Sequence, residues 1–233
     1  MHFHMASAQV TTARADVQSK LKDGGVGLII VDVQNDFCEG GSLAVPHASR
    51  IIPIINQLRS ARAWDAIILT QDWHPPSHAS FGSNNPGSKL FTEVELPGIG
   101  KQMMWPDHCV QGSHGAAFHA SLQRTPDDVI VRKGKNERVD SYSGFGDATG
   151  GSLERTELAD VLQSKGITNV FVVGLATDYC VSATARDALK NGLNTFLVLD
   201  ACAGIADEST GTALKSVQDG GGHVILSNAV APA

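Results

Sequence analysis

Short apolar runs alternate along the chain with segments whose apolar residues recur at helical spacing. The runs are rich in β-branched residues, which is typical of strands buried on both faces of a parallel sheet. These predicted strands cover residues 27–33, 66–70, 128–132, 169–175, 195–200 and 223–226. The helical patterns cover residues 49–63, 153–165, 179–191 and 208–219, and residues 15–22 have the pattern for one or two further turns.

Strands that alternate with helices predict a single α/β domain, with three layers (α/β/α) and a mostly parallel central sheet. We expect the domain to span residues 26–233, after a loosely structured, flexible N-terminal extension over residues 1–25. The segment from Gln71 to Pro126 lacks strong periodicity and is too long for an ordinary connection, which indicates a functional insertion. Ligands of such sheets bind beyond the carboxyl ends of the strands, so polar residues there are the candidates for chemistry.

Composition narrows the class of protein. Hydrophobic residues make up 42% of the 233 positions, too many for a disordered chain, while no run approaches the roughly 18 apolar residues of a membrane span. The net charge of −6 argues against a nucleic-acid partner. The chain has no apolar signal-peptide region, and its four cysteines are too few for a disulfide framework. We therefore expect a cytoplasmic protein with reduced thiols and no membrane or nucleic-acid partner.

Four predicted strands bring polar residues to one edge of the sheet. Asp32 follows the first strand, Asp72 and His74 follow the second, Lys133 follows the third, and Cys180 lies beyond the fourth. A random scatter of polar residues would not favour one end of the strands so consistently. This convergence indicates a reactive site at the carboxyl edge.

Cys180 lies in the first turn of a predicted helix, with Thr177 or Asp178 as the expected N-cap. The N–H groups of such a turn favour a thiolate, lower the thiol pKa and can bind an oxyanion. Lys133 would add positive charge, and Asp32 would accept the thiol proton. Each residue alone has a plainer role, as a packed thiol, a surface amine or a turn carboxylate. Their convergence favours a nucleophilic Cys/Asp/Lys site.

Asp72 and His74 also form a candidate metal site. In extended chain, residues i and i+2 point to the same side, so this pair can hold one cation through an oxygen and an imidazole nitrogen. His78 and His108 are candidates to complete the set. Mixed oxygen and nitrogen ligands suit Zn²⁺, Mn²⁺ or Fe²⁺ without discriminating sharply among them.

Five sequence blocks carry these residues. They are IIVDVQNDFCEGGSLAV (29–45), TQDWHPPSHASF (70–81), WPDHCVQGSHGAAFH (105–119), RKGKNERVDSYSGF (132–145) and VVGLATDYCVSATARDALKNG (172–192). They resemble the nicotinamidase branch of the isochorismatase-like cysteine hydrolases, and the resemblance covers residues 27–226. DWH followed by WPDHC separates the metal-containing nicotinamidases from their metal-free relatives, so the resemblance is specific.

The resemblance implies an isochorismatase-like hydrolase fold with a catalytic triad and one divalent metal, Zn²⁺ first, with Mn²⁺ or Fe²⁺ as alternatives. The implied triad is Asp32, Lys133 and Cys180. The implied metal ligands are Asp72, His74 and His108, and His78 matches a position that is a ligand in only some relatives.

The resemblance also implies how a substrate is held. A cis peptide is expected between Leu175 and Ala176, and the backbone N–H groups of Ala176 and Cys180 are expected to form an oxyanion hole. The implied substrate-binding residues are Phe37, Trp105, Tyr142 and Leu175.

The implied activity is hydrolysis of nicotinamide, a small-molecule substrate, to nicotinate and ammonia through a Cys thioester, with the metal on the pyridine nitrogen. NAD salvage would be its setting, pyrazinamide a second substrate, and a homo-oligomer a candidate assembly. The alternative within the superfamily is a metal-free hydrolase, such as an isochorismatase or a carbamoyl or ureidoacrylate amidase. A catalytically silent interaction protein and a redox-sensing thiol protein are alternatives from other classes, and neither needs the candidate metal ligands.

Overall fold

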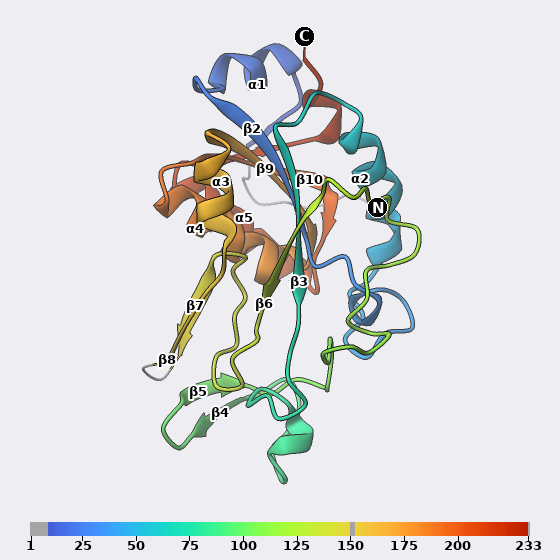
Figure 1. Ribbon diagram of the computed structural model, residues 1–233, viewed down its shortest axis with the longest axis vertical. Helices are drawn as coiled ribbons and strands as arrows, with labels where there is room; N and C mark the ends of the chain where they lie inside the picture. Colours follow the sequence, from blue (N-terminus) through green and yellow to red (C-terminus); the bar gives the residue numbers. More distant parts are fainter. Residues whose placement is uncertain (1–8, 150–151, 233) are drawn as a thin grey trace.

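The computed structural model of the protein describes residues 9–149 and 152–232. At its centre lies a seven-stranded sheet in the order β1-β11-β10-β9-β2-β3-β6, and every pairing in it is parallel (Figure 1). Its strands are Val10–Thr11 (β1), Gly25–Val31 (β2), Ala66–Asp72 (β3), Val129–Lys133 (β6), Ile167–Leu175 (β9), Asn194–Ala203 (β10) and His223–Ile225 (β11). The predicted parallel sheet is confirmed.

Helices cover both faces of this sheet (Figure 1). They are Arg14–Lys20 (α1), Ile52–Arg59 (α2), Leu158–Ser164 (α3), Ser182–Lys190 (α4) and Asp207–Asp219 (α5). The first two contribute to one apolar core and the last three to the other. Helices on both faces of one sheet confirm the predicted single-domain, three-layer arrangement. None of these helices, within the described part of the chain, is both long and apolar enough to cross a membrane.

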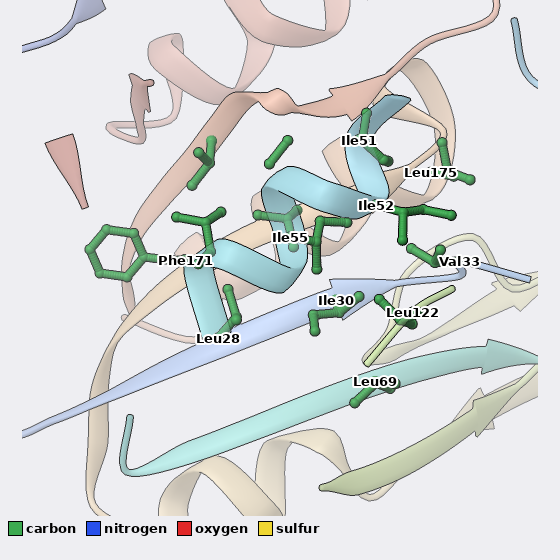
Figure 2. Packing of buried hydrophobic residues seen from close by; sticks show 14 of the residues in the cluster. Leu28, Ile30, Val33, Ile51, Ile52, Ile55, Leu69, Leu122, Phe171 and Leu175 are labelled. Atoms are coloured by element: carbon green, nitrogen blue, oxygen red, sulfur yellow. The ribbon is translucent and has the colours of Figure 1, made fainter. Parts of the chain in front are cut away.

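The side chains of β2 point alternately to the two faces of the sheet, which explains why the sequence of this strand is a continuous apolar run. Leu28 and Ile30 face the core under α2, where Ile52 and Ile55 pack over them (Figure 2). The intervening residues, such as Ile29, face the core on the opposite side. A strand buried on both faces needs apolar residues at every position, which is the pattern of a parallel sheet.

The prediction places the start of the helix over residues 153–165 about one turn too early. Ser152–Arg155 forms a strand (β8) that pairs antiparallel with Gly146–Thr149 (β7), and α3 starts only at Leu158. Leu153 fitted the helical spacing, yet its side chain is 59% exposed. An apolar residue that faces solvent therefore extended the predicted periodicity beyond the true end of the helix.

The predicted insertion leaves the sheet at the end of β3 and returns before β6. It contains a second antiparallel hairpin, Glu93–Leu96 (β4) and Gly100–Met103 (β5). Isolated bridges join His74 to Val110 and Phe81 to Trp105. These bridges draw the two ends of the insertion together beside the carboxyl end of β3.

Residues from 9 onward, which we expected in a loosely structured extension, pack on the domain. β1 pairs with β11, and Val17 of α1 is buried in the core. The buried side chain of Asn169 anchors the chain after α1, because its Oδ1 accepts from Lys22 N and its Nδ2 donates to Lys22 O, both at 2.9 Å. Residues 1–8 of the expected extension lie outside the described residues.

This anchor gives a stability prediction. We expect Asn169→Ala to lower the free energy of unfolding by about 1–3 kcal/mol, because it removes both partly buried bonds to the Lys22 backbone and the buried bond from Asn194 Nδ2. Urea unfolding measures the change. Asn191→Ala is the control, since that exposed side chain donates to the Asp187 carbonyl of α4, the helix it directly follows, and should matter by less than about 0.5 kcal/mol. Equal losses in both variants would contradict the anchoring role.

Candidate active site

The carboxyl ends of four adjacent strands supply the candidate catalytic side chains. Asp32 follows β2, Asp72 ends β3, and Lys133 ends β6 directly opposite Asp72 in the strand register. Cys180 lies beyond β9, in a π-helical turn (Thr177–Val181) that leads into α4. The strand order β9-β2-β3-β6 thus brings residues from distant parts of the sequence to one edge.

Lys133 lies at the centre of this cluster. Its Nζ is 2.9 Å from Asp32 Oδ2 and 3.4 Å from Cys180 Sγ, and it also donates to the Ser141 carbonyl at 3.0 Å and to the Asp72 carboxylate. Asp32 and Lys133 are fully buried, and Cys180 is 7% exposed. The structure therefore brings the three residues predicted as a triad into direct contact.

Burial and the neighbouring charges determine the protonation states of Asp32 and Lys133. Burial raises the pKa of Asp32, Lys133 opposes that change, and the pKa settles at about 6. Burial disfavours the charge on Lys133, but the neighbouring carboxylates Asp32 and Asp72 outweigh it and hold the Lys133 pKa well above its ordinary value. Lys133 thus remains a cation while Asp32 titrates close to neutral pH, which suits Asp32 to accept and return a proton.

The predicted lowering of the Cys180 pKa is wrong. Burial raises the pKa of this thiol well above its ordinary value; Lys133 opposes that effect, and Asp32 adds to it. The charge of one ammonium is shared with two carboxylates and does not compensate for the loss of water. The resting nucleophile is therefore a thiol that needs a base, and Asp32 is in place to be that base.

The predicted N-cap of the Cys180 helix is also wrong, because Asp178 binds elsewhere. Its carboxylate accepts hydrogen bonds from the backbone N–H groups of Ile205 at 3.0 Å and Ala206 at 3.3 Å, and from Ser209 Oγ at 2.5 Å. No side chain of the described residues caps the turn that holds Cys180. Asp178 instead ties this turn to the segment before α5, and Ile205 of that segment lines the pocket above the thiol.

Asp72, His74 and His108 form a compact group of potential metal ligands. One ligand atom from each lies within 4.8 Å of the others, and all three side chains are buried. Nε2 of His74 is buried and has no hydrogen-bond partner among the described residues. Nδ1 of His74 lies 2.9 Å from the Gly134 carbonyl, and Nδ1 of His108 lies 2.8 Å from the Pro106 carbonyl. A ring held through one nitrogen presents the other to a metal, as is usual for ligating histidines.

The charges of this group also suit a cation. Burial opposes ionisation of Asp72, but Lys133 outweighs it and lowers the Asp72 pKa, so this group is a carboxylate. Burial, helped by His74, lowers the pKa of His108 to about 4, which keeps its imidazole neutral and able to ligate. One carboxylate and two imidazoles with an otherwise unpartnered nitrogen fit a divalent ion such as Zn²⁺, Mn²⁺ or Fe²⁺.

His78, the fourth candidate ligand, lies beside this group but uses its nitrogens elsewhere. Its Nδ1 is 2.7 Å from Ser80 Oγ, and its Nε2 is 3.1 Å from the Val139 carbonyl. Its ring packs against that of His74, with centroids 4.2 Å apart. In this structure His78 supports His74 by packing, and it does not join the converging ligand atoms.

A pocket opens onto Cys180, Asp72 and His108. Three of the four predicted substrate-binding residues line it: Phe37, Trp105 and Tyr142. Ala176 lines it as well, and the expected cis peptide between Leu175 and Ala176 is confirmed. Leu175 itself does not line this pocket, because its side chain is fully buried in the core on the α2 side of the sheet (Figure 2).

Sequence reasoning missed five residues that line this pocket: Leu43, Val45, Asp140, Tyr179 and Ile205. The first four belong to the quoted sequence blocks, so closer attention to those blocks could have found them. Ile205 belongs to no motif and reaches the pocket only through the tertiary contact with Asp178. No local signal could have identified it.

The chain is similar to known proteins over most of its length. The model of the isochorismatase domain matches residues 26–229. A nicotinamidase of Acinetobacter baylyi is 48% identical over 178 residues, which cover 76% of this chain and 81% of that protein. The structure of an Acinetobacter baumanii nicotinamidase pyrazinamidease has a TM-score of 0.80 at 44% identity, covering 87% of this chain and 96% of the other. The Pyrococcus horikoshii pyrazinamidase in complex with zinc has a TM-score of 0.71 at 35% identity, covering 87% and 99%.

Proposed function

The chain belongs to the isochorismatase family, and we propose that its active site hydrolyses nicotinamide to nicotinate and ammonia. The observation that carries the proposal is one pocket lined both by Cys180, which Lys133 contacts, and by Asp72 and His108 of the compact Asp/His/His group. The similarity to nicotinamidases and pyrazinamidases over most of the chain supports the same substrate class. We extend the proposal to deamidation of pyrazinamide and to a role in NAD salvage.

The chemistry begins with the Cys180 thiol and Asp32. As Sγ attacks the carboxamide carbon, Asp32 takes the thiol proton, and Lys133 stabilises the sulfur from 3.4 Å. The backbone N–H groups of Ala176 and Cys180 hold the oxyanion. Asp32 then gives its proton to the departing nitrogen, so that ammonia leaves and a thioester remains on Cys180.

Hydrolysis of the thioester reverses these roles. Asp32 takes a proton from water as the water oxygen attacks the thioester carbon, and it returns that proton to the departing sulfur. The neutral acid and the free thiol result, and the acid then loses its proton to solvent to become nicotinate. A divalent ion held by Asp72, His74 and His108 would supply a Lewis acid for the pyridine nitrogen and for water.

The pocket walls suit a flat heteroaromatic ring. Phe37, Trp105 and Tyr142 line it, and edge-to-face packing with Tyr179 fixes the Trp105 ring, with centroids 5.4 Å apart. Aromatic walls bury the faces of a ring, while the polar groups at the end of the pocket orient it. We propose that these walls bind the ring of the substrate above Cys180.

Ammonia release from nicotinamide tests the proposed function. We expect turnover of nicotinamide and of pyrazinamide, and none of isochorismate or ureidoacrylate. Turnover of ureidoacrylate without nicotinamide turnover, by protein whose Cys180 is intact and whose metal has been restored, would assign the chain to another activity of the superfamily.

The pKa of Asp32 gives a pH prediction. Asp32 must be ionised to accept the thiol proton, and its pKa is raised to about 6, so kcat/KM should fall as the pH drops through about 6. Thr70 Oγ1 donates to Asp32 Oδ1 at 2.6 Å and favours the carboxylate. Thr70→Val should therefore move the acid limb of the profile to higher pH.

A pH–rate series on both proteins measures the shift. Thr195→Val is the matched control, because in the described structure the buried Thr195 hydroxyl on β10 donates to the Leu193 carbonyl just before that strand and not to Asp32. The acid limb of this control should stay where it is in the wild-type protein. If the acid limb of Thr70→Val does not move, the group that titrates in the pH–rate profile is not Asp32.

A further inference from the structure

Asp140 is a buried carboxylate in the pocket to which neither the triad nor the candidate metal group assigns a role. Its side chain is 7% exposed, and it lines the same pocket as Cys180. Its Oδ2 accepts from Gln102 Nε2 at 2.9 Å and from Trp105 Nε1 at 3.2 Å. A buried carboxylate costs free energy unless something compensates for it, so its position calls for a physical reason.

The donors around Asp140 stabilise its charge. The Gln102 amide is buried and the Trp105 ring is a pocket wall, so both N–H groups are held in place. Burial, together with Asp140, raises the pKa of Tyr142 well above its ordinary value, so the nearby phenol remains a neutral donor. Asp140 therefore presents a fixed negative charge to whatever enters the pocket.

The balance of charge in the pocket depends on this residue. Among the described residues of the site, the carboxylates Asp32, Asp72 and Asp140 and the ammonium group of Lys133 sum to a formal charge of −2. Lys133 contacts Asp32 and Asp72, and Asp140 lines the pocket. A divalent ion held by Asp72, His74 and His108 would bring the sum of these formal charges to zero. Without Asp140 the same loaded site would carry one positive charge, which attracts anions.

We propose that Asp140 determines the charge specificity of the pocket, admitting neutral aromatic amides and repelling aromatic carboxylates. The inference rests on the proposed function, since hydrolysis turns a neutral amide into a carboxylate anion. Repulsion between like charges is strong where little water screens it. Asp140 would thus speed release of the acid product and exclude anionic ring compounds, without taking part in the bond-breaking steps.

Asp140→Asn tests the proposal, because it removes the charge and keeps an oxygen that can accept from Trp105. Titration calorimetry with nicotinate measures binding directly, with the protein loaded with Zn²⁺ and again after chelation. We expect Asp140→Asn to bind nicotinate tighter by on the order of tenfold in the loaded protein. The KM for nicotinamide should change by a smaller factor than the nicotinate Kd, because nicotinamide carries no charge. Asp160→Asn, which removes an exposed charge from α3, is the control and should change neither value.

The outcomes separate charge selection from a structural role. Loss of nicotinate and nicotinamide affinity together would show that Asp140 only holds Trp105 and Gln102 in place, and unchanged nicotinate affinity would also overturn the proposal. If Asp140→Asn fails to fold, a measurement on the wild-type protein still tests the proposal. The wild-type protein should bind the neutral analogue 3-hydroxymethylpyridine at least about fivefold tighter than nicotinate, and equal binding would overturn the proposal. Failure of nicotinamide turnover would instead count against the proposed function, because calorimetry requires no turnover.

Discussion

Cys180→Ala should lower kcat for nicotinamide by on the order of 10⁴–10⁶-fold, the range seen when a covalent nucleophile is removed. The other three cysteines cannot replace it. Cys38, Cys109 and Cys202 do not line the pocket. Burial also raises the pKa of Cys38 to about 11 and that of Cys202 to about 12, and it raises that of Cys109 well above the ordinary value.

Binding should survive this substitution. The aromatic walls Phe37, Trp105 and Tyr142 remain, so we expect the Kd for nicotinamide to change by no more than about threefold, which is under 1 kcal/mol. Ammonia release measures turnover, and titration calorimetry measures binding. Cys202→Ala is the matched control, because that thiol lies on β10 near the Val172 carbonyl and should leave turnover unchanged. Turnover by Cys180→Ala within tenfold of the wild-type protein would remove Cys180 from the mechanism.

The arrangement of the site could be predicted because it follows from the sheet. Apolar runs locate strands that are buried on both faces, and parallel pairing places all of their carboxyl ends on one side. Asp32, Asp72 and Lys133 each stand at or just after such an end, so their proximity needed only the order of the strands. Because β3 and β6 are adjacent and parallel, their last residues, Asp72 and Lys133, lie opposite each other in the strand register.

The energetics of the nucleophile could not be predicted from its local sequence. A cysteine in a first helical turn suggests a lowered pKa, but burial of Cys180 near the carboxylates of Asp32 and Asp72 raises it. Desolvation depends on the insertion and on the segment before α5, which lie far from Cys180 in the sequence. The same distant segment draws Asp178 away from the predicted capping role and brings Ile205 into the pocket.

Leu175 illustrates a different limit. Its place in the motif next to Ala176 predicts a pocket residue, and the backbone does lead into the pocket at Ala176. Side chains alternate along β9, however, and Leu175 falls on the face that packs against the α2 core. A motif therefore places the backbone correctly and still leaves open the face to which each side chain points.

Removing the divalent ion should have the second-largest effect, and His108→Ala is the sharper way to remove it. Asp72 contacts both Lys133 and the candidate metal site, so a change at Asp72 would disturb the triad as well. No ion pair or hydrogen bond in the described part of the structure joins His108 to the triad, and its Nδ1 is held by the Pro106 carbonyl. We expect His108→Ala to lower kcat/KM by at least about 10²-fold, since loss of even a supporting metal-site residue costs 10–100-fold.

Metal content distinguishes loss of the ion from loss of the fold. Elemental analysis should show about one divalent ion per wild-type chain and far less in His108→Ala, while the exposed His114→Ala control keeps both ion and activity. Chelation of the wild-type protein should suppress turnover and lower Tm, because an ion that binds only the folded state stabilises it. Adding Zn²⁺, Mn²⁺ or Fe²⁺ should restore both in the wild-type protein but not in His108→Ala at the same concentration. Full nicotinamide turnover by metal-free protein would show that the Asp32, Lys133 and Cys180 cluster suffices without an ion.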